Sequence, residues 1–252
     1  GQRVMAMVLS GACCAEYVQA STRDYTFPSG ITFPAADIMP LPDNVSGSQG
    51  LVYLINYRLA HILFHSYIAI PTEATVIVHG AAGGFGSVTT MIARANGNTV
   101  IALSRTAEEV EFCLANGADH SLNMTKVDYV DEVMKITNGT GADYSINGVS
   151  GDTLDKDAHA MKTFGEIVIY GYAAGRASFD PWVADKSLTV KSFYADDFLG
   201  GPALPNANEA MYECFRSGQI ADVTRIFELA DAPAAHELID SGKSMGKIAL
   251  KI

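Results

Sequence analysis

Residues 75–104 read TVIVHGAAGGFGSVTTMIARANGNTVIALS, and this stretch decides the fold of the chain. The apolar run TVIVH is followed by a glycine-rich turn, by a segment whose apolar residues recur at helical spacing, and by a second apolar run, TVIALS. Short apolar runs bounded by turn residues are typical of buried strands. The stretch therefore predicts a strand, a tight turn, a helix and a second strand parallel to the first.

The same alternation continues toward the C-terminus. Helical segments separate four more strand-like runs: HSLNM (120–124), DYSIN (143–147), GEIVIYG (165–171) and SLTVKSF (187–193). With the first two runs they make six strands, as in a doubly wound sheet of two mononucleotide-binding halves. Thr106 and Glu109 form a capping-box pattern at the start of one helix, and Gly117 follows its end. We predict an α/β fold with a parallel, Rossmann-type sheet.

The glycine-rich turn predicts dinucleotide binding. In the spacing G-x-G-x-x-G the three positions fall on Ala81, Gly83 and Gly86, so the first is alanine. Gly83 lets the backbone approach a pyrophosphate, Gly86 lets the helix pack closely, and the helix N-terminus supplies unpaired N–H groups. Such a motif is also compatible with a methyltransferase or with a tight turn that binds nothing. The flanking strands and helix favour the dinucleotide.

The end of the second strand favours NADPH over NADH. An NAD-preferring site usually places an acidic residue there for the ribose hydroxyls, whereas this chain has Ser104 and Arg105. A guanidinium and a hydroxyl suit the 2′-phosphate of NADPH. The alternative interpretation is a solvated surface arginine whose field is diluted by Glu108 and Glu109.

Composition excludes several classes of partner. The chain has 17 basic and 28 acidic residues and a net charge of −11, which disfavours nucleic acid and anionic membrane surfaces. No apolar run approaches the ~20 residues that cross a bilayer, and we expect a cytoplasmic protein. The four cysteines, at 13, 14, 113 and 214, have no metal-ligand spacing, so we expect neither structural zinc nor a disulfide framework.

The two ends of the chain differ in character from the predicted sheet. RVMAMV (3–8) and CAEYVQA (14–20) are predicted strands, and residues 51–65 a helix. After residue 193 we predict helices at 206–217 and 234–240 and strands at 223–229 and 246–252. The first residues already have the pattern of a strand interior, and we expect the chain to lack a preceding segment.

Together these segments resemble the zinc-independent, zeta-crystallin-like quinone oxidoreductases of the medium-chain dehydrogenase/reductase superfamily. The resemblance is carried by GQRV (1–4), CAEYV (14–18), PLPDNVS (40–46), HGAAGGFG (79–86), LANGADHSLN (114–123), GVSGDT (148–153) and ADAPAAHELIDSGKSMGKIAL (230–250). The AAGGFG turn and the GKIAL ending together are a specific signature.

The resemblance implies a Rossmann domain joined to a partial GroES-like β-barrel domain built from both chain ends. The expected domains are residues 1–58 (partial GroES-like), 59–195 (Rossmann, NADP-binding) and 196–252 (return to the first domain). NADPH would lie between them and pass a hydride to a quinone or another conjugated carbonyl, without zinc. The alternative is an NADPH-binding protein with little turnover, because most of the first half of the family's barrel is absent. We also expect a homodimer formed through an edge strand.

Site residues are carried over from the family position by position. The pyrophosphate would meet Ala82, Gly83, Gly84, Phe85 and Gly86, and the adenosine phosphate would meet Ser104 and Arg105. The expected neighbours of the ribose and nicotinamide are Asn147, Val149, Gly171 and Tyr172, with Phe193 and Lys247 also close to the cofactor.

Catalytic residues are harder to assign. The family's Thr-Ala pair in the helix before the sheet is replaced by Leu59, Ala60 and His61, so a hydroxyl near the nicotinamide is lost. His61 and Tyr57 are the candidates to replace it, against the alternative that the histidines are structural. A family tyrosine that helps to hold the 2′-phosphate falls on Met124, which leaves more of that task to Arg105. The predicted helix at 51–65 contains no cysteine, which disfavours a zinc site there.

Overall fold

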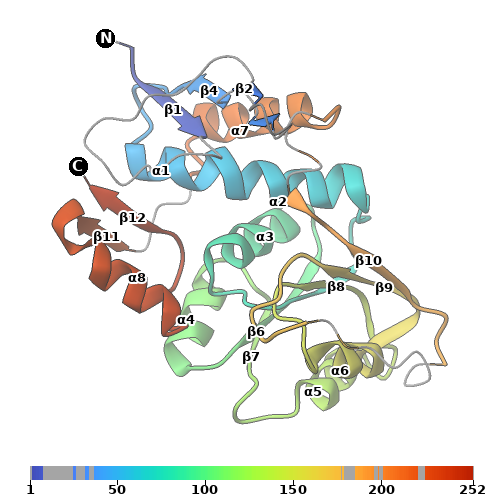
Figure 1. The fold of residues 1–252 in the computed structure, drawn as a ribbon. Helices are drawn as coiled ribbons and strands as arrows, with labels where there is room; N and C mark the ends of the chain where they lie inside the picture. Colours follow the sequence, from blue (N-terminus) through green and yellow to red (C-terminus); the bar gives the residue numbers. More distant parts are fainter. Residues whose placement is uncertain are drawn as a thin grey trace. The chain divides into compact units, whose positions relative to one another are not determined.

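The computed structural model describes residues 2–7, 25–26, 32–33, 37–176, 178, 185–195, 198, 201–220 and 225–251. The chain forms two compact units (Figure 1). The terminal unit is Gly1–Arg58 with Asn206–Ile252, and the sheet unit is Leu59–Pro205. The second boundary therefore lies after residue 205, later than the expected boundary after residue 195. The predicted strand at 14–20, with Cys13 and Cys14, lies outside the described residues.

The sheet unit contains the predicted six-stranded parallel sheet. Its order is β10-β9-β8-β5-β6-β7, so the chain starts in the middle, winds to one edge and then winds to the other. This is the strand order of a doubly wound Rossmann sheet, and the predicted fold class is confirmed. The strands are β5 (Thr75–Val78), β6 (Thr99–Ser104), β7 (His120–Asn123), β8 (Ala142–Asn147), β9 (Met161–Ile169) and β10 (Thr189–Ser192).

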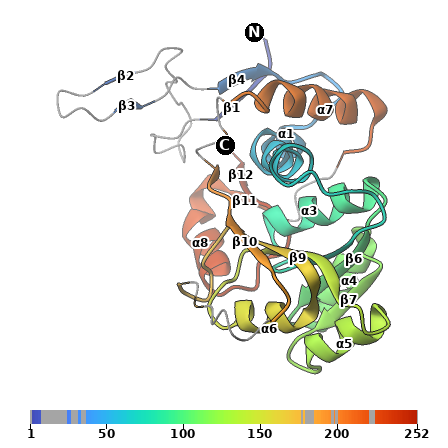
Figure 2. The same cartoon turned by 90° about the vertical axis from the view of Figure 1, so that its right-hand side faces the viewer.

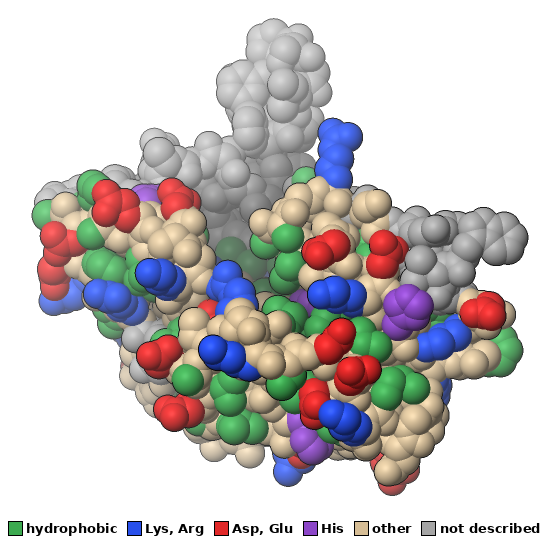
Figure 3. Space-filling view, turned by 90° about the horizontal axis from the view of Figure 1, so that it is seen from below, with side chains coloured by type: hydrophobic (Ala, Val, Ile, Leu, Met, Phe, Trp, Pro, Cys, Tyr) green, Lys and Arg blue, Asp and Glu red, His purple; other side chains and the backbone are tan. Residues whose placement is uncertain are grey.

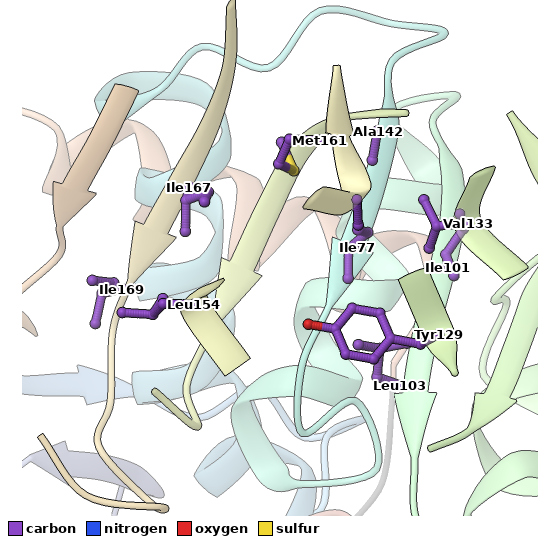
Figure 4. Close-up of a cluster of buried hydrophobic side chains, with 11 residues drawn as sticks. Ile77, Ile101, Leu103, Tyr129, Val133, Ala142, Leu154, Met161, Ile167 and Ile169 are labelled. Carbon is purple, nitrogen blue, oxygen red and sulfur yellow. The ribbon is translucent and has the colours of Figure 1, made fainter. Parts of the chain in front are cut away.

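Helices connect these strands. They are α3 (Gly84–Ala95), α4 (Ala107–Ala115), α5 (Tyr129–Ile136) and α6 (Thr153–Ala160). Along the chain, α3 follows β5 and α4 follows β6. The helices α5 and α6 lie side by side against the sheet (Figures 1 and 2). One hydrophobic cluster joins α5 and α6 to the strands, and it includes Ile77, Ile101, Leu103, Tyr129, Val133, Leu154 and Ile167 (Figure 4). This cluster fixes the carboxyl ends of β5 and β8 relative to α6.

The terminal unit contains short strand pairs, the helices α7 and α8, and the first part of a longer helix that begins at Gly47. The antiparallel pairs are β1 (Val4–Met7) with β4 (Asp37–Pro40) and β2 (Tyr25–Thr26) with β3 (Thr32–Phe33). The parallel pair is β11 (Arg225–Glu228) with β12 (Ile248–Lys251). The helices are α7 (Leu204–Ser217) and α8 (Ala232–Asp240), the latter preceded by the 3₁₀ turn η5 (Leu229–Asp231). Both helices were predicted close to these bounds.

The helix predicted at 51–65 begins earlier and is irregular. It comprises α1 (Gly47–Val52), the π-helical η1 (Tyr53–Tyr57), α2 (Arg58–Ile62) and the π-helical η2 (Leu63–Tyr67). Ser46 caps its start, because the Ser46 hydroxyl accepts the Gln49 N–H and the Gln49 side chain accepts the Ser46 N–H. This capping box was missed in the sequence, where the apolar run from Leu51 onward is the stronger signal.

The capping box predicted at Thr106 is only half formed. The Thr106 hydroxyl accepts the Glu109 N–H at 3.1 Å, as expected. The Glu109 carboxylate, however, accepts the N–H of Arg105 at 2.7 Å instead of the N–H of Thr106. The predicted stop at Gly117 is confirmed by its left-handed φ of +102°.

Candidate functional site at the β5 and β8 turns

The strand order reverses between β5 and β8. β6 is the next strand on one side and β9 the next on the other, so the connections leave this point in opposite directions. Ligands of open parallel sheets bind outside the carboxyl ends of the strands at such a switch point. Two connections begin there, which we name the β5 turn (residues 79–83) and the β8 turn (residues 148–152).

The β5 turn bends at Gly80. Its φ of +58° lies in the left-handed region that glycine adopts at least cost. The Gly80 carbonyl oxygen accepts the Gly83 N–H at 2.9 Å, which closes the turn directly before α3. The position that the motif assigns to its first glycine is Ala81, which is buried. Gly80 is therefore a site residue that the motif spacing missed, although a glycine directly after the strand signals such a bend.

Gly86 permits the close approach of α3 to this turn. A Cβ atom at Gly86 would lie 2.2 Å from the Gly80 carbonyl oxygen and 2.8 Å from the Ala81 Cα. At Gly83 the same carbonyl oxygen would lie 3.2 Å from an added Cβ, a tighter contact than most Cβ atoms make. Both distances involve backbone atoms, so a side chain at Gly86 requires the turn itself to move. The predicted glycine requirements thus have a defined steric cause.

The first turn of α3 presents backbone donors. Gly83 is the N-cap and, having no side chain, leaves this helix end without a side-chain cap. The N–H groups of Gly84, Phe85 and Gly86 have no partner inside the helix, because the first intrahelical bond is from the Ser87 N–H to the Gly83 carbonyl. No acidic residue lies in this turn. Unpaired N–H groups and the positive end of the helix dipole together suit an anion such as a pyrophosphate. Ala82 is buried beside them.

At the end of β6 the two predicted phosphate ligands differ. The Ser104 side chain is buried, and its hydroxyl lies 3.1 Å from the Ser121 hydroxyl and 3.6 Å from the Cys113 sulfur. It therefore faces the protein interior, and the structure does not support its predicted contact with a cofactor phosphate. The Arg105 side chain is 55% exposed and pairs with Glu109 at 3.2 Å. Both earlier interpretations of Arg105 stay compatible with this position.

Asn147 ends β8 and is fully buried. Its Oδ1 accepts the N–H groups of Val149 at 2.9 Å and Ser150 at 2.8 Å. Its Nδ2 donates to the Thr153 hydroxyl at 3.0 Å and to Asp157 at 2.8 Å. An amide side chain has two donors and two acceptor positions, so all four are used. The Asn147 side chain therefore shapes the β8 turn, and the predicted contact of this residue with the ribose stays a prediction.

The turn after β9 lies beside the β8 turn. The Ser150 hydroxyl donates to the Gly171 carbonyl at 2.7 Å, and a Cβ at Gly171 would lie 2.7 Å from the Gly148 carbonyl oxygen. Val149 is half-buried and Tyr172 is 61% exposed. Val149, Gly171 and Tyr172 therefore lie at the sheet edge where they were predicted, and their contacts with a cofactor stay predictions.

Tyr170 is a site residue that the sequence analysis missed. Its hydroxyl donates to the His79 carbonyl at 3.3 Å, and its ring lies 4.6 Å from that of Phe85. A Cβ at Gly148 would lie 2.3 Å from the Tyr170 ring, so a glycine is needed beneath it. Burial raises the pKa of Tyr170, which keeps the hydroxyl protonated. The tyrosine thus links the β5 and β8 turns.

Two further predicted residues belong to the sheet unit. Phe193 follows β10, is buried, and packs against Phe198 at 4.5 Å and Tyr67 at 5.5 Å. His61 lies in α2 with its ring 4.4 Å from that of His65. Burial, with a smaller contribution from the positive charge of His65, lowers the pKa of His61 to about 4. His61 is therefore neutral at pH 7.

Tyr57 and Lys247 belong to the terminal unit. The Tyr57 ring stacks on Tyr53 at 4.8 Å, and its hydroxyl lies 3.2 Å from the Cys214 sulfur. Burial and the hydrogen bond with Cys214 raise the pKa of Tyr57, which makes it a weaker acid than an exposed tyrosine. Lys247 precedes β12 and is half-buried, and burial lowers its pKa.

The described residues show neither a metal-binding group nor a membrane-spanning helix. Nowhere in this part of the chain do three or more His, Cys, Asp or Glu side chains form a group that could hold a metal ion. Within the same residues, no helix combines the length and the apolar character that a bilayer crossing requires. The face in Figure 3 shows acidic and basic side chains interspersed, without a continuous basic patch.

The strand order and the glycine-lined, uncapped helix start define a doubly wound protein of the nucleotide-binding class. A family model described as a zinc-binding dehydrogenase matches residues 84–205. The 2-haloacrylate reductase of a Burkholderia species is 28% identical over 86% of this chain and 68% of that protein. The quinone oxidoreductase of Pongo abelii is 33% identical over 54% of this chain and 42% of that protein.

Solved structures agree. A mycobacterial protein solved in complex with NADPH has a TM-score of 0.80 and 27% identity, and the match covers 88% of this chain and 70% of that protein. The chain is therefore similar in sequence and in fold to quinone oxidoreductases and related reductases, the group that its sequence resembles. It spans 70% or less of the length of each of these relatives.

Proposed function

We propose that this chain is an NADPH-dependent oxidoreductase that reduces a quinone or another electron-poor conjugated carbonyl without zinc. The observation that carries the proposal is the first turn of α3, where unpaired N–H groups meet a bend that Gly83 and Gly86 keep clear of side chains. The NADPH complex of the mycobacterial protein supports the choice of cofactor. The proposed substrate class is supported by two similar proteins, which are a 2-haloacrylate reductase and a quinone oxidoreductase.

The residues of the switch point fit a dinucleotide. Gly84, Phe85 and Gly86 would bind the pyrophosphate through their N–H groups, and Arg105 would bind the adenosine 2′-phosphate. Val149, Gly171 and Tyr172 would lie nearest the ribose and nicotinamide. When bound, NADPH supplies a hydride, and the protein contributes binding and orientation. Contacts of Phe193 and Lys247 with the cofactor are part of the same proposal.

Neither catalytic candidate is suited to donate a proton at neutral pH. His61 is already neutral above its pKa of about 4, and the raised pKa of Tyr57 makes its proton harder to release. A quinone needs little acid catalysis, because the charge on its reduced oxygen is delocalised and water can protonate it. The lack of a metal-ligand group among the described residues is compatible with such chemistry. The catalytic assignments of Tyr57 and His61 stay predictions.

The rival proposal is an NADPH-binding protein with little turnover. The enzyme proposal and the rival proposal are distinguished by mixing the purified protein with NADPH and a quinone series that includes 9,10-phenanthrenequinone. Loss of NADPH absorbance is followed together with the dissociation constant of NADPH. Steady oxidation supports the enzyme, and tight binding without oxidation supports the rival. Absence of NADPH binding contradicts both.

The preference for NADPH is tested at Arg105. We expect Arg105→Ala to weaken NADPH binding by about 1.5–3 kcal/mol, the range of a hydrogen bond to a charged group, and to change NADH binding little. Because Glu109 pairs with the guanidinium at 3.2 Å, Glu109→Gln is expected to shift selectivity the other way, toward NADPH. Dissociation constants for both nucleotides, measured at low ionic strength, check this. Equal losses for NADPH and NADH in Arg105→Ala contradict the assignment.

We also propose a homodimer. Among the described strands β10 lies at one edge of the sheet, where its partner is β9, and Val190 is exposed on it. An exposed strand edge is a template for pairing with a second chain. Sedimentation velocity that shows a monomer at micromolar concentration would contradict this proposal. The expectation of a cytoplasmic protein stays a prediction.

A further inference from the structure

Asp157 is a fully buried carboxylate on α6 that the proposed chemistry does not use. Four polar side chains from three other elements surround it. Its Oδ1 lies 2.7 Å from His79 Nε2 and 2.8 Å from the Tyr129 hydroxyl. Its Oδ2 lies 2.7 Å from the Ser145 hydroxyl and 2.8 Å from Asn147 Nδ2. A carboxylate has about four acceptor positions, and all of them are used here.

The carboxylate is charged at neutral pH. Burial alone raises the pKa of Asp157, but the interaction with His79 and the hydrogen bonds from His79, Ser145 and Tyr129 outweigh burial, so the pKa lies below its usual value. An ionised carboxylate only accepts hydrogen bonds. His79 therefore donates its Nε2 proton to Asp157, and the network has a single consistent arrangement of donors.

Two of the four donor residues stand where the β5 turn and the β8 turn begin. His79 is the first residue after β5 and opens the β5 turn, which leads to the N–H groups of α3. Asn147 is the last residue of β8 and opens the β8 turn. The Asp157 carboxylate therefore holds both His79 and Asn147, the residues from which the two turns start. It does so from α6, the helix that follows the β8 turn.

The β8 turn needs such support because it is strained. Ser150 has a φ of +58°, a left-handed conformation that is unfavourable for a non-glycine residue. Asn147 holds the turn by accepting the N–H groups of Val149 and Ser150, and its amide is itself oriented by Asp157. Strained backbone of this kind persists only where its surroundings over-determine it, and it is concentrated at functional sites.

Burial of a charge is a poor way to gain stability. An apolar side chain of similar volume usually stabilises a buried helix position as well or better, because removing a carboxylate from water is costly. Here four further polar side chains are buried with it, of which His79, Ser145 and Asn147 are fully inaccessible. What the network gains is one fixed geometry for two turns.

We propose that Asp157 is a positioning residue for nicotinamide-nucleotide binding, which holds the β5 and β8 turns at the spacing that the dinucleotide requires. The inference rests on the proposed function. Asp157 touches no ligand itself and acts through His79 and Asn147. Its loss therefore impairs nucleotide binding beyond what any loss of stability explains.

The test compares Asp157→Asn with Tyr129→Phe. Asp157→Asn keeps the shape of the side chain but presents a donor where the network needs an acceptor. Tyr129→Phe is the matched control, because it removes a hydrogen bond to Asp157 Oδ1, and one to the Thr153 carbonyl, but lies on α5, outside both turns. The dissociation constant of NADPH is measured by its fluorescence, well below the unfolding temperature of each variant. ¹⁵N chemical shifts report on the Val149 and Ser150 amides.

Asp157→Asn is expected to weaken NADPH binding at least about tenfold, as misplacement of binding groups by a fraction of an ångström does. It is also expected to shift both amide resonances. Tyr129→Phe is expected to stay within about threefold of the original chain. Equal effects of the two variants, or unchanged binding in Asp157→Asn, overturn the inference while leaving the proposed function intact.

Two outcomes need separate treatment. If the unmodified chain itself binds no nicotinamide nucleotide, the proposed function fails and this inference fails with it. If Asp157→Asn does not fold, Asp157→Ser is measured against the same control, because a smaller neutral hydroxyl leaves room for the surrounding donors. Binding by Asp157→Ser that matches the unmodified chain overturns the inference, and a tenfold loss supports it.

Discussion

Replacement of Gly86 by alanine is expected to abolish NADPH binding and to lower the free energy of unfolding by about 1–3 kcal/mol, the usual cost of an overpacked contact. The added Cβ would lie 2.2 Å from the Gly80 carbonyl oxygen and 2.8 Å from the Ala81 Cα. Neither backbone atom can swing aside as a flexible side chain does. Either α3 moves away from β5 or the β5 turn opens, and both changes displace the N–H groups that the proposed pyrophosphate site uses.

The measurements are equilibrium urea unfolding and NADPH titration. Gly83→Ala is a graded control, because its Cβ would lie 3.2 Å from the same oxygen, and a smaller loss of binding is expected. Gly47→Ala is the neutral control, since an added Cβ has no atom within 4 Å there. If Gly86→Ala binds NADPH as tightly as Gly47→Ala does, the first turn of α3 is not the nucleotide site.

Replacement of Gly141 by alanine is expected to destabilise the sheet unit by about 3 kcal/mol or more, from left-handed strain and overpacking together. Gly141 has a φ of +88°, and its Cβ would lie 2.5 Å from the Met161 carbonyl carbon and 2.6 Å from the Lys162 nitrogen. These are backbone atoms at the start of β9. The substitution therefore forces apart the beginnings of β8 and β9 on the side of the sheet away from the proposed site.

Gly139 provides a matched control for the strain alone. It has a similar φ of +82°, but an added Cβ would meet no atom within 4 Å. Gly139→Ala is accordingly expected to cost only about 1 kcal/mol, the lower end of left-handed strain. Urea unfolding of both variants separates the two contributions. A loss in Gly141→Ala no larger than that in Gly139→Ala would show that β9 yields to the added methyl group.

The sheet could be predicted because its signals are local. The central strands β5 and β6 are short apolar runs, and the glycine spacing between β5 and α3 reports a steric requirement that the structure reproduces at Gly83 and Gly86. The order of the strands then follows from the number of alternating units and the preference for right-handed crossovers. The fold therefore needed little information from distant residues.

The polar details of the site could not be predicted in the same way. Ser104 follows the expected strand, but only the structure shows that its hydroxyl faces Ser121 and Cys113. Glu109 fits a capping box by spacing, yet its carboxylate turns back to Arg105. Which way a short polar side chain points depends on neighbours brought by other strands, and the sequence pattern does not contain them.

Asp157 did leave a signal in the sequence. Leu154 and Ala158 recur at the spacing of a buried helix face, and Asp157 falls on that face. A charged residue among buried positions is rare unless it is paired, so it marks a polar network. Its partners come from other elements and could not be named. Tyr57 and Cys214 likewise come together only through the folding of the terminal unit.

The carbonyl oxygen of Gly80 limits two positions at once, since added methyl groups at residues 83 and 86 would both meet it. Tolerance to substitution at these positions should therefore be correlated. In a saturation library selected for ligand binding, variants with a side chain at residue 86 should be recovered only with a second substitution that moves the Gly80 carbonyl oxygen. The same second change should then relax the requirement at 83.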